Sequence, residues 1–169
     1  GIDSTSELIA AISKVTGVPE TRVQGRLFRE AMARGSSVVE ACQAYNVTPH
    51  VYDRHMEAFY TSGSDGFLYE LSIGNQLPGQ KRINQLVDDF VRGFALDKLN
   101  HQILVLSDGI GSDSLRLAML GYKVTYFEFA GPSCDFAKMR FKRCGVEESI
   151  NIVNDVAELP QKSFDVIVN

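Results

Sequence analysis

The sequence predicts an α/β fold, a doubly wound parallel sheet of about four strands preceded by an α-helical N-terminal region. Residues 1–61 contain helical patterns only, whereas short apolar runs appear in the second half of the chain. Helical patterns fill the first two gaps between these runs, and each of those helices ends at a glycine, Gly121 or Gly145. Continuous apolar runs that alternate with helices are typical of parallel strands buried on both faces. The predicted strands are 103–106, 123–127, 150–153 and 164–168.

Composition and charge are those of a soluble globular protein. Of the 169 residues, 44% are apolar and 22% are charged, and the net charge is −4. No attraction of the whole chain to nucleic acid or to an anionic membrane is therefore expected. The three cysteines stand at unrelated spacings, which indicates reduced thiols in a cytoplasmic protein rather than disulfides or a metal site. Neither a membrane-spanning apolar stretch nor a signal peptide is predicted.

Four helices are predicted in the N-terminal region, each from a start signal and an apolar face. Ser37 with Glu40 has the spacing of a capping box at the third helix. Thr48 and Pro49 predict the start of the fourth helix. Tyr52 would then lie in the fourth helix, and we expect it to pack inwards.

A break rich in small polar residues, 62–66, is the expected domain boundary. It divides the chain into a helical N-terminal cap or lid, 1–61, and a ligand-binding α/β domain, 62–169. Beyond the break, 78–94 is the clearest predicted helix. Its large apolar residues recur on one face of an amphipathic helix: Ile83, Leu86, Val87, Phe90, Val91 and Phe94.

The turn after the first predicted strand carries the pattern of a ligand site. Gly109 and Gly111 lack a Cβ atom, so a ligand can approach the backbone, and the helix that follows offers free N–H groups. Glu128 ends the second predicted strand, where a carboxylate can accept both hydroxyl hydrogens of a ribose. We expect these three residues to line a crevice at the carboxyl ends of the strands and to bind an adenosine-type ligand. The alternative is a simple tight turn beside a solvated glutamate.

The glycine spacing distinguishes between nucleoside ligands. The dinucleotide fingerprint requires a third glycine, which would fall at Ser114. An NAD(P)-type site is therefore the alternative rather than the first choice. Residues 102–169 instead resemble the class I S-adenosylmethionine (SAM)-dependent methyltransferases, which have a Rossmann-like sheet. The phrases that carry the resemblance are SDGIGSD, LGYKVTYFEF, SCDFAKMRFKRCG and LPQKSFDVIVN.

The resemblance implies that SAM is the cofactor and that the chain is part of a methyltransferase. It implies that Glu128 binds the ribose, with Phe129 beside it, and that Asp155 lies near the adenine amino group, with Val156 beside it. The loop around the methionine part of the cofactor would comprise Ser107, Asp108, Gly109, Gly111 and Asp113.

Two positions depart from the family pattern. Ser107 stands where the family has its first acid, and Asp108 follows one residue later. Asp113 replaces the third glycine, close to the expected position of the methionine carboxylate. Two like charges repel there unless a cation or proton intervenes, and Asp113 could instead cap the following helix.

The resemblance also implies an incomplete sheet. The family has seven strands, and the four predicted here would lie in the order 3-2-1-4, with strand four as an unpaired edge. We therefore expect a domain truncated at its C-terminus, whose sheet is completed by a missing C-terminal half or in a homodimer. The methyl acceptor and the catalytic base are not identified, and the chain alone is expected to be inactive.

A second class of function is a binding module. Residues 37–56 have the outline of a helix-turn-helix, which would make the N-terminal region a regulatory module fused to a degenerate, non-catalytic methyltransferase fold. However, residues 1–61 contain six basic and seven acidic side chains, whereas DNA binding requires neutralisation of phosphates. Asp53 would also lie in the recognition helix. A helical cap over the cofactor crevice is therefore favoured over a nucleic-acid partner.

Overall fold

A parallel four-stranded sheet forms the centre of the protein in the computed structural model, which describes residues 4–48, 50–61, 64–94, 97–98, 100–161 and 164–169. The strand order is β3-β2-β1-β4, so the α/β fold class and the order 3-2-1-4 are confirmed. The strands are β1 (Gln102–Leu106), β2 (Lys123–Phe127), β3 (Ile150–Val153) and β4 (Val166–Val168).

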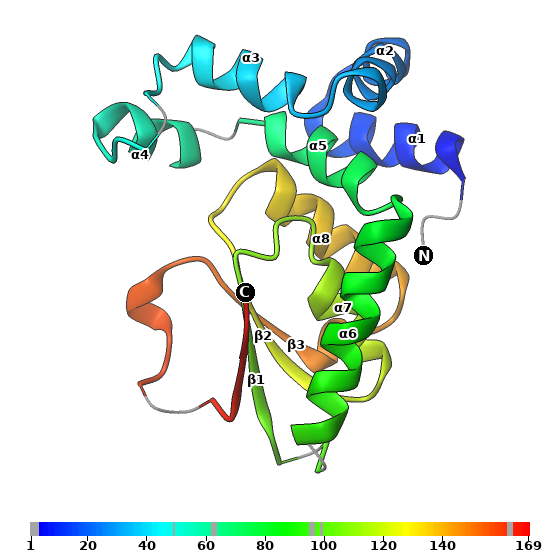
Figure 1. The fold of residues 1–169 in the computed structure, drawn as a ribbon, viewed down its shortest axis with the longest axis vertical. Coiled ribbons are helices and arrows are strands. Elements are labelled where there is room, and N and C mark those ends of the chain that lie inside the picture. The colour runs from blue at the N-terminus through cyan, green and yellow to red at the C-terminus, as the bar shows by residue number, and fades with distance from the viewer. Residues whose placement is uncertain (1–3, 49, 62–63, 95–96, 99, 162–163) are drawn as a thin grey trace.

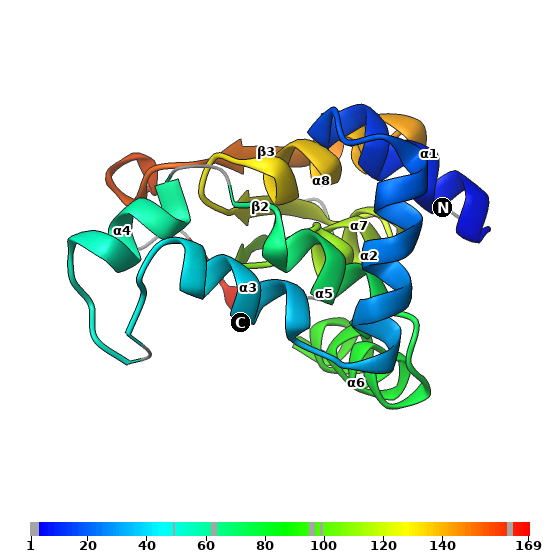
Figure 2. The same ribbon diagram turned by 90° about the horizontal axis from the view of Figure 1, so that it is seen from above.

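One face of the sheet is covered by three helices. These are α6 (Pro78–Phe94), α7 (Ser112–Met119) and α8 (Pro132–Arg143), and they lie in a row with α6 at the β4 end (Figure 2). The main core lies between this row and the sheet, where Val105 and Tyr126 pack with Leu117 and Phe141.

The other face carries a smaller cluster of Leu104, Phe127 and Val153, packed against Leu159 and Phe164 of the β3–β4 connection. That connection contains a short 3₁₀ helix, η2 (Val156–Glu158).

The N-terminal helices form a layer over the carboxyl ends of the strands (Figure 1). They are α1 (Thr5–Thr16), α2 (Glu20–Met32), α3 (Ser36–Ala44), α4 (Arg54–Thr61) and α5 (Gly66–Gly74). A second core joins this layer to the rest of the protein, since Ile12, Val23 and Leu68 pack with Ile110 and Phe136. This cluster crosses the expected boundary at 62–66, so the N-terminal helices share buried surface with the turn after β1 and with α8.

Two predicted helix starts were wrong. Ser37 does not cap α3, because the carboxylate of Glu30 does so from α2. Glu30 accepts hydrogen bonds from the backbone N–H groups of Gly35 (2.5 Å) and Ser37 (2.9 Å). Ser37 therefore lies inside the helix and is buried.

The fourth helix begins at Arg54 rather than at Thr48, because the Asp53 carboxylate caps it. Tyr52 precedes the helix and is 79% exposed, so the prediction that it packs inwards was wrong. Pro49 lies outside the described residues.

The boundaries of α6 agree with the predicted helix, Pro78–Phe94, but its apolar face is only partly covered. Val91 is fully buried, and Val87 packs against the core. Four other large apolar residues of the same face are exposed: Ile83, Leu86, Phe90 and Phe94.

Candidate functional site

The turn after β1 is held in position from β2. Ser107, Gly109 and Gly111 all have positive φ angles, of 52°, 54° and 71°, which produce a tight turn at the end of the strand. The Tyr126 hydroxyl donates to the Gly109 carbonyl at 2.6 Å, and the Gly109 N–H donates to Glu128 Oε2 at 2.7 Å. The glycine turn and the acid at the end of β2 are therefore in direct contact, as the sequence predicts.

The two glycines serve different contacts. Gly111 is buried, and a Cβ atom there would lie 2.5 Å from Phe141 Cζ and 2.9 Å from Ala137 Cβ of α8. The structure therefore places Gly111 in the core rather than on the crevice, which corrects the prediction for this residue. At Gly109 a Cβ atom would collide with the Leu71 side chain of α5. The absence of a side chain at this position therefore allows Leu71 to pack against the turn.

Arg140 of α8 holds the other side of the turn. Its Nη1 donates to the Ile110 carbonyl at 2.5 Å and to the Ser112 hydroxyl at 3.0 Å. Asn75, at the end of α5, donates to the same hydroxyl at 3.0 Å. Burial lowers the pKa of Arg140 from its ordinary value, and the nearby Asp108 carboxylate opposes this shift.

Asp108 caps α7 from within the turn. Its Oδ1 accepts from the N–H of Asp113 at 3.0 Å, and its Oδ2 accepts from the N–H of Ser114 at 2.7 Å. Burial and the Asp113 charge raise the pKa of Asp108 to about 6, against the effect of these hydrogen bonds. The start of α7 therefore already holds an internal carboxylate, whereas the sequence pattern predicted that its N–H groups would be free to bind a ligand.

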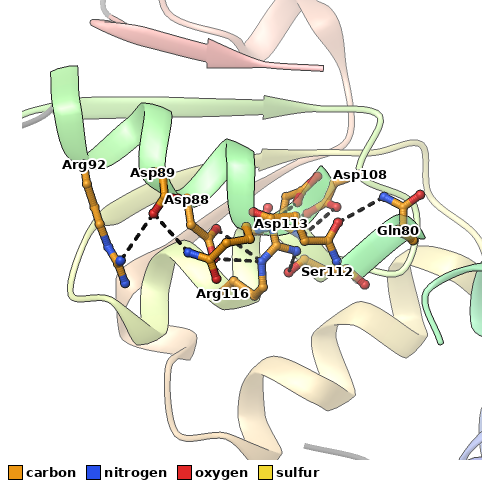
Figure 3. Close-up of polar contacts among 11 residues, drawn as sticks. Gln80, Asp88, Asp89, Arg92, Asp108, Ser112, Asp113 and Arg116 are labelled. Atoms are coloured by element: carbon orange, nitrogen blue, oxygen red, sulfur yellow. Dashed lines mark hydrogen bonds and ion pairs between the residues drawn. The ribbon is translucent and has the colours of Figure 1, made fainter. Parts of the chain in front are cut away.

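Asp113 is paired with a cation, Arg116, one turn further along α7 (Figure 3). Arg116 Nε also lies 3.2 Å from Asp88 of α6, and these side chains are only 24% and 12% exposed. The charge of Asp113 is thus balanced within the protein, and Asp113 does not act as the helix cap.

The larger of two adjoining cavities beside the glycine turn has a volume of about 390 Å³ and lies between this turn, the β2–α8 loop and the helices α4 and α5. Four of the predicted site residues line it, namely Ser107, Gly109, Glu128 and Phe129. Its other lining residues are Phe59, Tyr60, Ser64, Phe67, Glu70, Leu71, Ala130, Gly131, Pro132 and Ser133.

Aromatic rings form one wall of this larger cavity. The rings of Tyr60 and Phe67 are stacked with centroids 6.1 Å apart, and Tyr60 lies 5.9 Å from Phe129. Glu128 faces the same space, and burial raises its pKa, while the N–H groups of Gly109 and Phe129 oppose the shift. A planar group with a hydroxyl-bearing substituent fits such a wall beside a carboxylate.

A smaller cavity, of about 180 Å³, adjoins the first and shares Glu70, Leu71 and Ser107 with it. Asp108 and Asp113 line it. Its character is polar, because the other lining residues include Arg34, Asn75, Gln80, Asn84, Ser112 and Asn169. The two cavities together form a groove with an aromatic half and a polar half, which is the candidate cofactor groove.

Asp155 and Val156 are not among the residues that line these two cavities. Asp155 caps η2 by accepting from the N–H of Ala157 at 2.8 Å, and Val156 is 62% exposed. The structure therefore brings together the candidates from the β1 turn and the end of β2, but not those after β3.

Sequence reasoning missed the lining residues of the helical layer, above all Leu71, Glu70 and Arg34. They lie on α5 and just before α3, and α5 was not predicted. Its sequence is apolar around most of its circumference, so it lacks the periodicity that reveals an amphipathic helix.

Within the described part of the chain, His, Cys, Asp and Glu side chains form no group of three that could hold a metal ion. None of the described helices is both long and apolar enough to span a membrane.

Comparison with known proteins shows distant likeness to solved structures only. No family model matches the sequence, and no curated protein matches it. Among solved structures, one match is the S-adenosylmethionine-dependent methyltransferase SibL in its apo form, with 16% sequence identity and a TM-score of 0.39. The match covers 77% of this chain, which spans 39% of the length of that protein.

Proposed function

We propose that the cofactor groove binds SAM and that this chain is the cofactor-binding part of a methyltransferase. One observation carries the proposal. The Glu128 carboxylate accepts from the Gly109 N–H at 2.7 Å and faces a cavity with an aromatic wall. An acid beside a glycine turn at the carboxyl ends of two parallel strands is an arrangement suited to a ribose.

The aromatic half of the groove suits the adenosine part of SAM. Each Glu128 oxygen already accepts one backbone N–H, and a carboxylate oxygen has capacity for a further donor. Glu128 can therefore bind the two ribose hydroxyls without losing its contacts to the turn. Phe129 and the Tyr60–Phe67 pair offer faces on which an adenine ring can stack.

The polar half suits the zwitterionic methionine part. Arg34 lines this half and pairs with Glu70 at 3.0 Å, so one cation and one anion are available for the α-carboxylate and the α-ammonium of the ligand. The pairing of Asp113 with Arg116 removes the repulsion that an unpaired Asp113 would exert on the α-carboxylate.

SAM supplies an activated methyl group on a sulfonium, which is transferred by in-line displacement. For such a reaction the protein contributes positioning and exclusion of water. Leu71 and the helical layer cover the glycine turn, so they would exclude water from the cofactor side of the reaction. Gly109 and Glu128 would fix the cofactor against β1 and β2.

Isothermal titration calorimetry with SAM, its demethylated product and NAD tests the proposal. We expect SAM or its product to bind more tightly than NAD. Glu128→Ala should weaken SAM binding about 10- to 100-fold, as expected for loss of a charge-assisted contact of about 1.5–3 kcal/mol. Glu147→Ala, at an exposed carboxylate beyond α8, is the matched control and should leave affinity unchanged. NAD binding equal to or tighter than SAM binding contradicts the proposal.

A further inference from the structure

Tyr126 lies beneath the turn after β1, two residues before Glu128. Its side chain is fully buried, and its ring packs edge-to-face on Phe141 of α8 with centroids 5.4 Å apart. Side chains two residues apart on a strand point to the same side, and those of Tyr126 and Glu128 both contact Gly109. Tyr126 is not among the residues that line the cofactor groove. Any effect of Tyr126 on a ligand in the groove must therefore pass through other residues.

Gly109 is held by these two side chains on either side of its Cα atom. Its N–H, which donates to Glu128, belongs to the preceding peptide unit, and its carbonyl, which accepts from Tyr126, belongs to the following one. Because peptide units are planar, only the φ and ψ angles of Gly109 set the orientation of one unit relative to the other. Glycine has the widest choice of these angles, and here φ is 54°. The two hydrogen bonds together remove that freedom.

The hydrogen bond from Tyr126 supplies a directional constraint that apolar packing does not. Leu71 fills the space beside Gly109, but apolar contacts have no preferred direction, whereas a hydrogen bond weakens steeply when its angle departs from linear. Additional strands beyond β4 would not replace the Tyr126 contact, because β1 lies between β4 and β2 in the sheet. Tyr126 therefore controls how well the Gly109 N–H is aimed at Glu128.

We propose that Tyr126 is a positioning residue for the ribose site. Its hydroxyl fixes the Gly109 carbonyl, and the fixed turn keeps the Gly109 N–H directed at Glu128 Oε2. The Glu128 carboxylate is thereby held with both oxygens oriented for the two ribose hydroxyls. This role rests on the proposed function, since it concerns the carboxylate that would bind the ribose. The alternative is that the Tyr126 hydroxyl only satisfies its own burial and that of the Gly109 carbonyl.

A test without ligand follows the Glu128 carboxyl group by ¹³C NMR as a function of pH. Burial raises the pKa of Glu128, and the N–H groups of Gly109 and Phe129 oppose that shift. In Tyr126→Phe we expect a higher Glu128 pKa than in the wild type, because the Gly109 N–H is less well aligned. Incorporation of 4-aminophenylalanine at position 126 restores a hydrogen-bond donor and should return the pKa towards the wild-type value.

The matched control is Val124→Ala, at a buried residue of the same strand and the same core cluster. It should lower the stability by removing core packing without changing the Glu128 pKa, since Val124 does not contact the turn by hydrogen bonds. Circular dichroism and thermal unfolding establish that each variant is folded. The wild type offers a measurement that needs no substitution. The Tyr126 hydroxyl proton should exchange slowly with solvent and show a nuclear Overhauser contact to Gly109.

Calorimetry with adenosine and 2′,3′-dideoxyadenosine shows whether the effect of Tyr126 reaches the ribose. Tyr126→Phe should weaken adenosine binding about 3- to 10-fold, the size expected for one hydrogen bond. Binding of dideoxyadenosine should not change, because this nucleoside lacks the ribose hydroxyls. In a Glu128→Gln background, Tyr126→Phe should have no further effect on adenosine affinity.

These measurements separate the role of Tyr126 from the proposed function. If the wild type binds neither adenosine nor SAM, the proposed function fails, and the ribose role of Tyr126 fails with it, even where the titration shows that Tyr126 orients Glu128. If the wild type binds adenosine, an unchanged Glu128 pKa in Tyr126→Phe overturns the inference alone. So does an equal pKa change in Val124→Ala, an equal loss of affinity for the two nucleosides, or a Tyr126 hydroxyl proton that shows no contact to Gly109.

Discussion

Glu128 Oε2 accepts a hydrogen bond from the Gly109 N–H at 2.7 Å. The contact joins the turn after β1 to the end of β2, and both residues line the larger cavity. A half-buried carboxylate that is held by backbone N–H groups has a fixed orientation and retains capacity to accept further donors. This relationship is the structural basis for the proposed cofactor groove.

Gly111 is predicted to be essential for packing rather than for ligand contact. Gly111→Ala should lower the free energy of unfolding by about 2–4 kcal/mol, because the new Cβ atom would strain the left-handed backbone and overlap Phe141. The control is Gly17→Ala, since Gly17 has nearly the same φ (72° against 71°) but no atom within 4 Å of an added Cβ. Urea unfolding should give about 1 kcal/mol for the control. Equal losses of unfolding free energy in the two variants would show that the Phe141 ring moves aside without cost.

Leu71 and Gly109 should be energetically coupled, because a Cβ atom at Gly109 would collide with the Leu71 side chain. Gly109→Ala alone should destabilise the protein, and Leu71→Ala should relieve part of that loss. A double-mutant cycle should give a coupling free energy of about 0.5–2 kcal/mol. Gly145→Ala, at a left-handed glycine with open space around it, should show no coupling to Leu71→Ala. Additive losses of stability for Gly109→Ala and Leu71→Ala would mean that Leu71 of α5 does not pack against the turn.

Arg116 is predicted to contribute more to stability than an exposed arginine of the same region. Arg116→Gln would leave Asp88 and Asp113 without their cation and should cost about 2–3 kcal/mol, because the pair with Asp88 is mostly buried. The control is Arg92→Gln, since the Arg92–Asp89 pair is about half exposed on each side and should contribute at most about 0.5 kcal/mol. Chemical unfolding at pH 7 measures both, and similar small losses would contradict the prediction.

The contribution of Asp108 to stability should fall as the pH rises from about 4 to about 6. The raised pKa of Asp108, about 6 in the folded protein against 3.8 as its ordinary value, means that the folded state binds this proton more tightly than the unfolded state. The stabilisation from Asp108 is therefore complete below about pH 4 and is lost as the pH passes the folded pKa, up to about 3 kcal/mol. Urea unfolding of the wild type and of Asp108→Asn at pH 4, 5, 6 and 7 should show a smaller pH slope in the variant. Asp135→Asn, at an exposed aspartate of α8, should keep the wild-type slope, and identical slopes in all three proteins would refute the assignment.

The sequence predicted the parts of the fold that depend on local pattern. The apolar run of β1 and the helical periodicity of α6 predicted the boundaries of these elements to within one residue. The contact of Gly109 with Glu128 followed from the rule that neighbouring parallel strands end at the same edge of the sheet.

Contacts between residues far apart in the sequence determine the structural features that the sequence pattern did not predict. Glu30 caps α3 from another helix, and no spacing along the chain predicts that. The glycine at 111 is required by Phe141, which lies 30 residues away in sequence, so a glycine pattern alone could not separate packing from binding. The periodicity of α6 revealed an apolar face but could not show that Phe90 would remain exposed.

The most direct test of the proposed cofactor groove follows the Gly109 amide during a titration with SAM. In a ¹⁵N-labelled chain, we predict a saturable shift of the Gly109 amide resonance, with the same Kd as calorimetry, since its N–H donates to the carboxylate that would bind the ribose. The Gly145 amide, at an exposed turn beyond α8, should not move. SAM binding that leaves the Gly109 resonance unchanged, or no binding by the folded chain at millimolar SAM, would contradict the account.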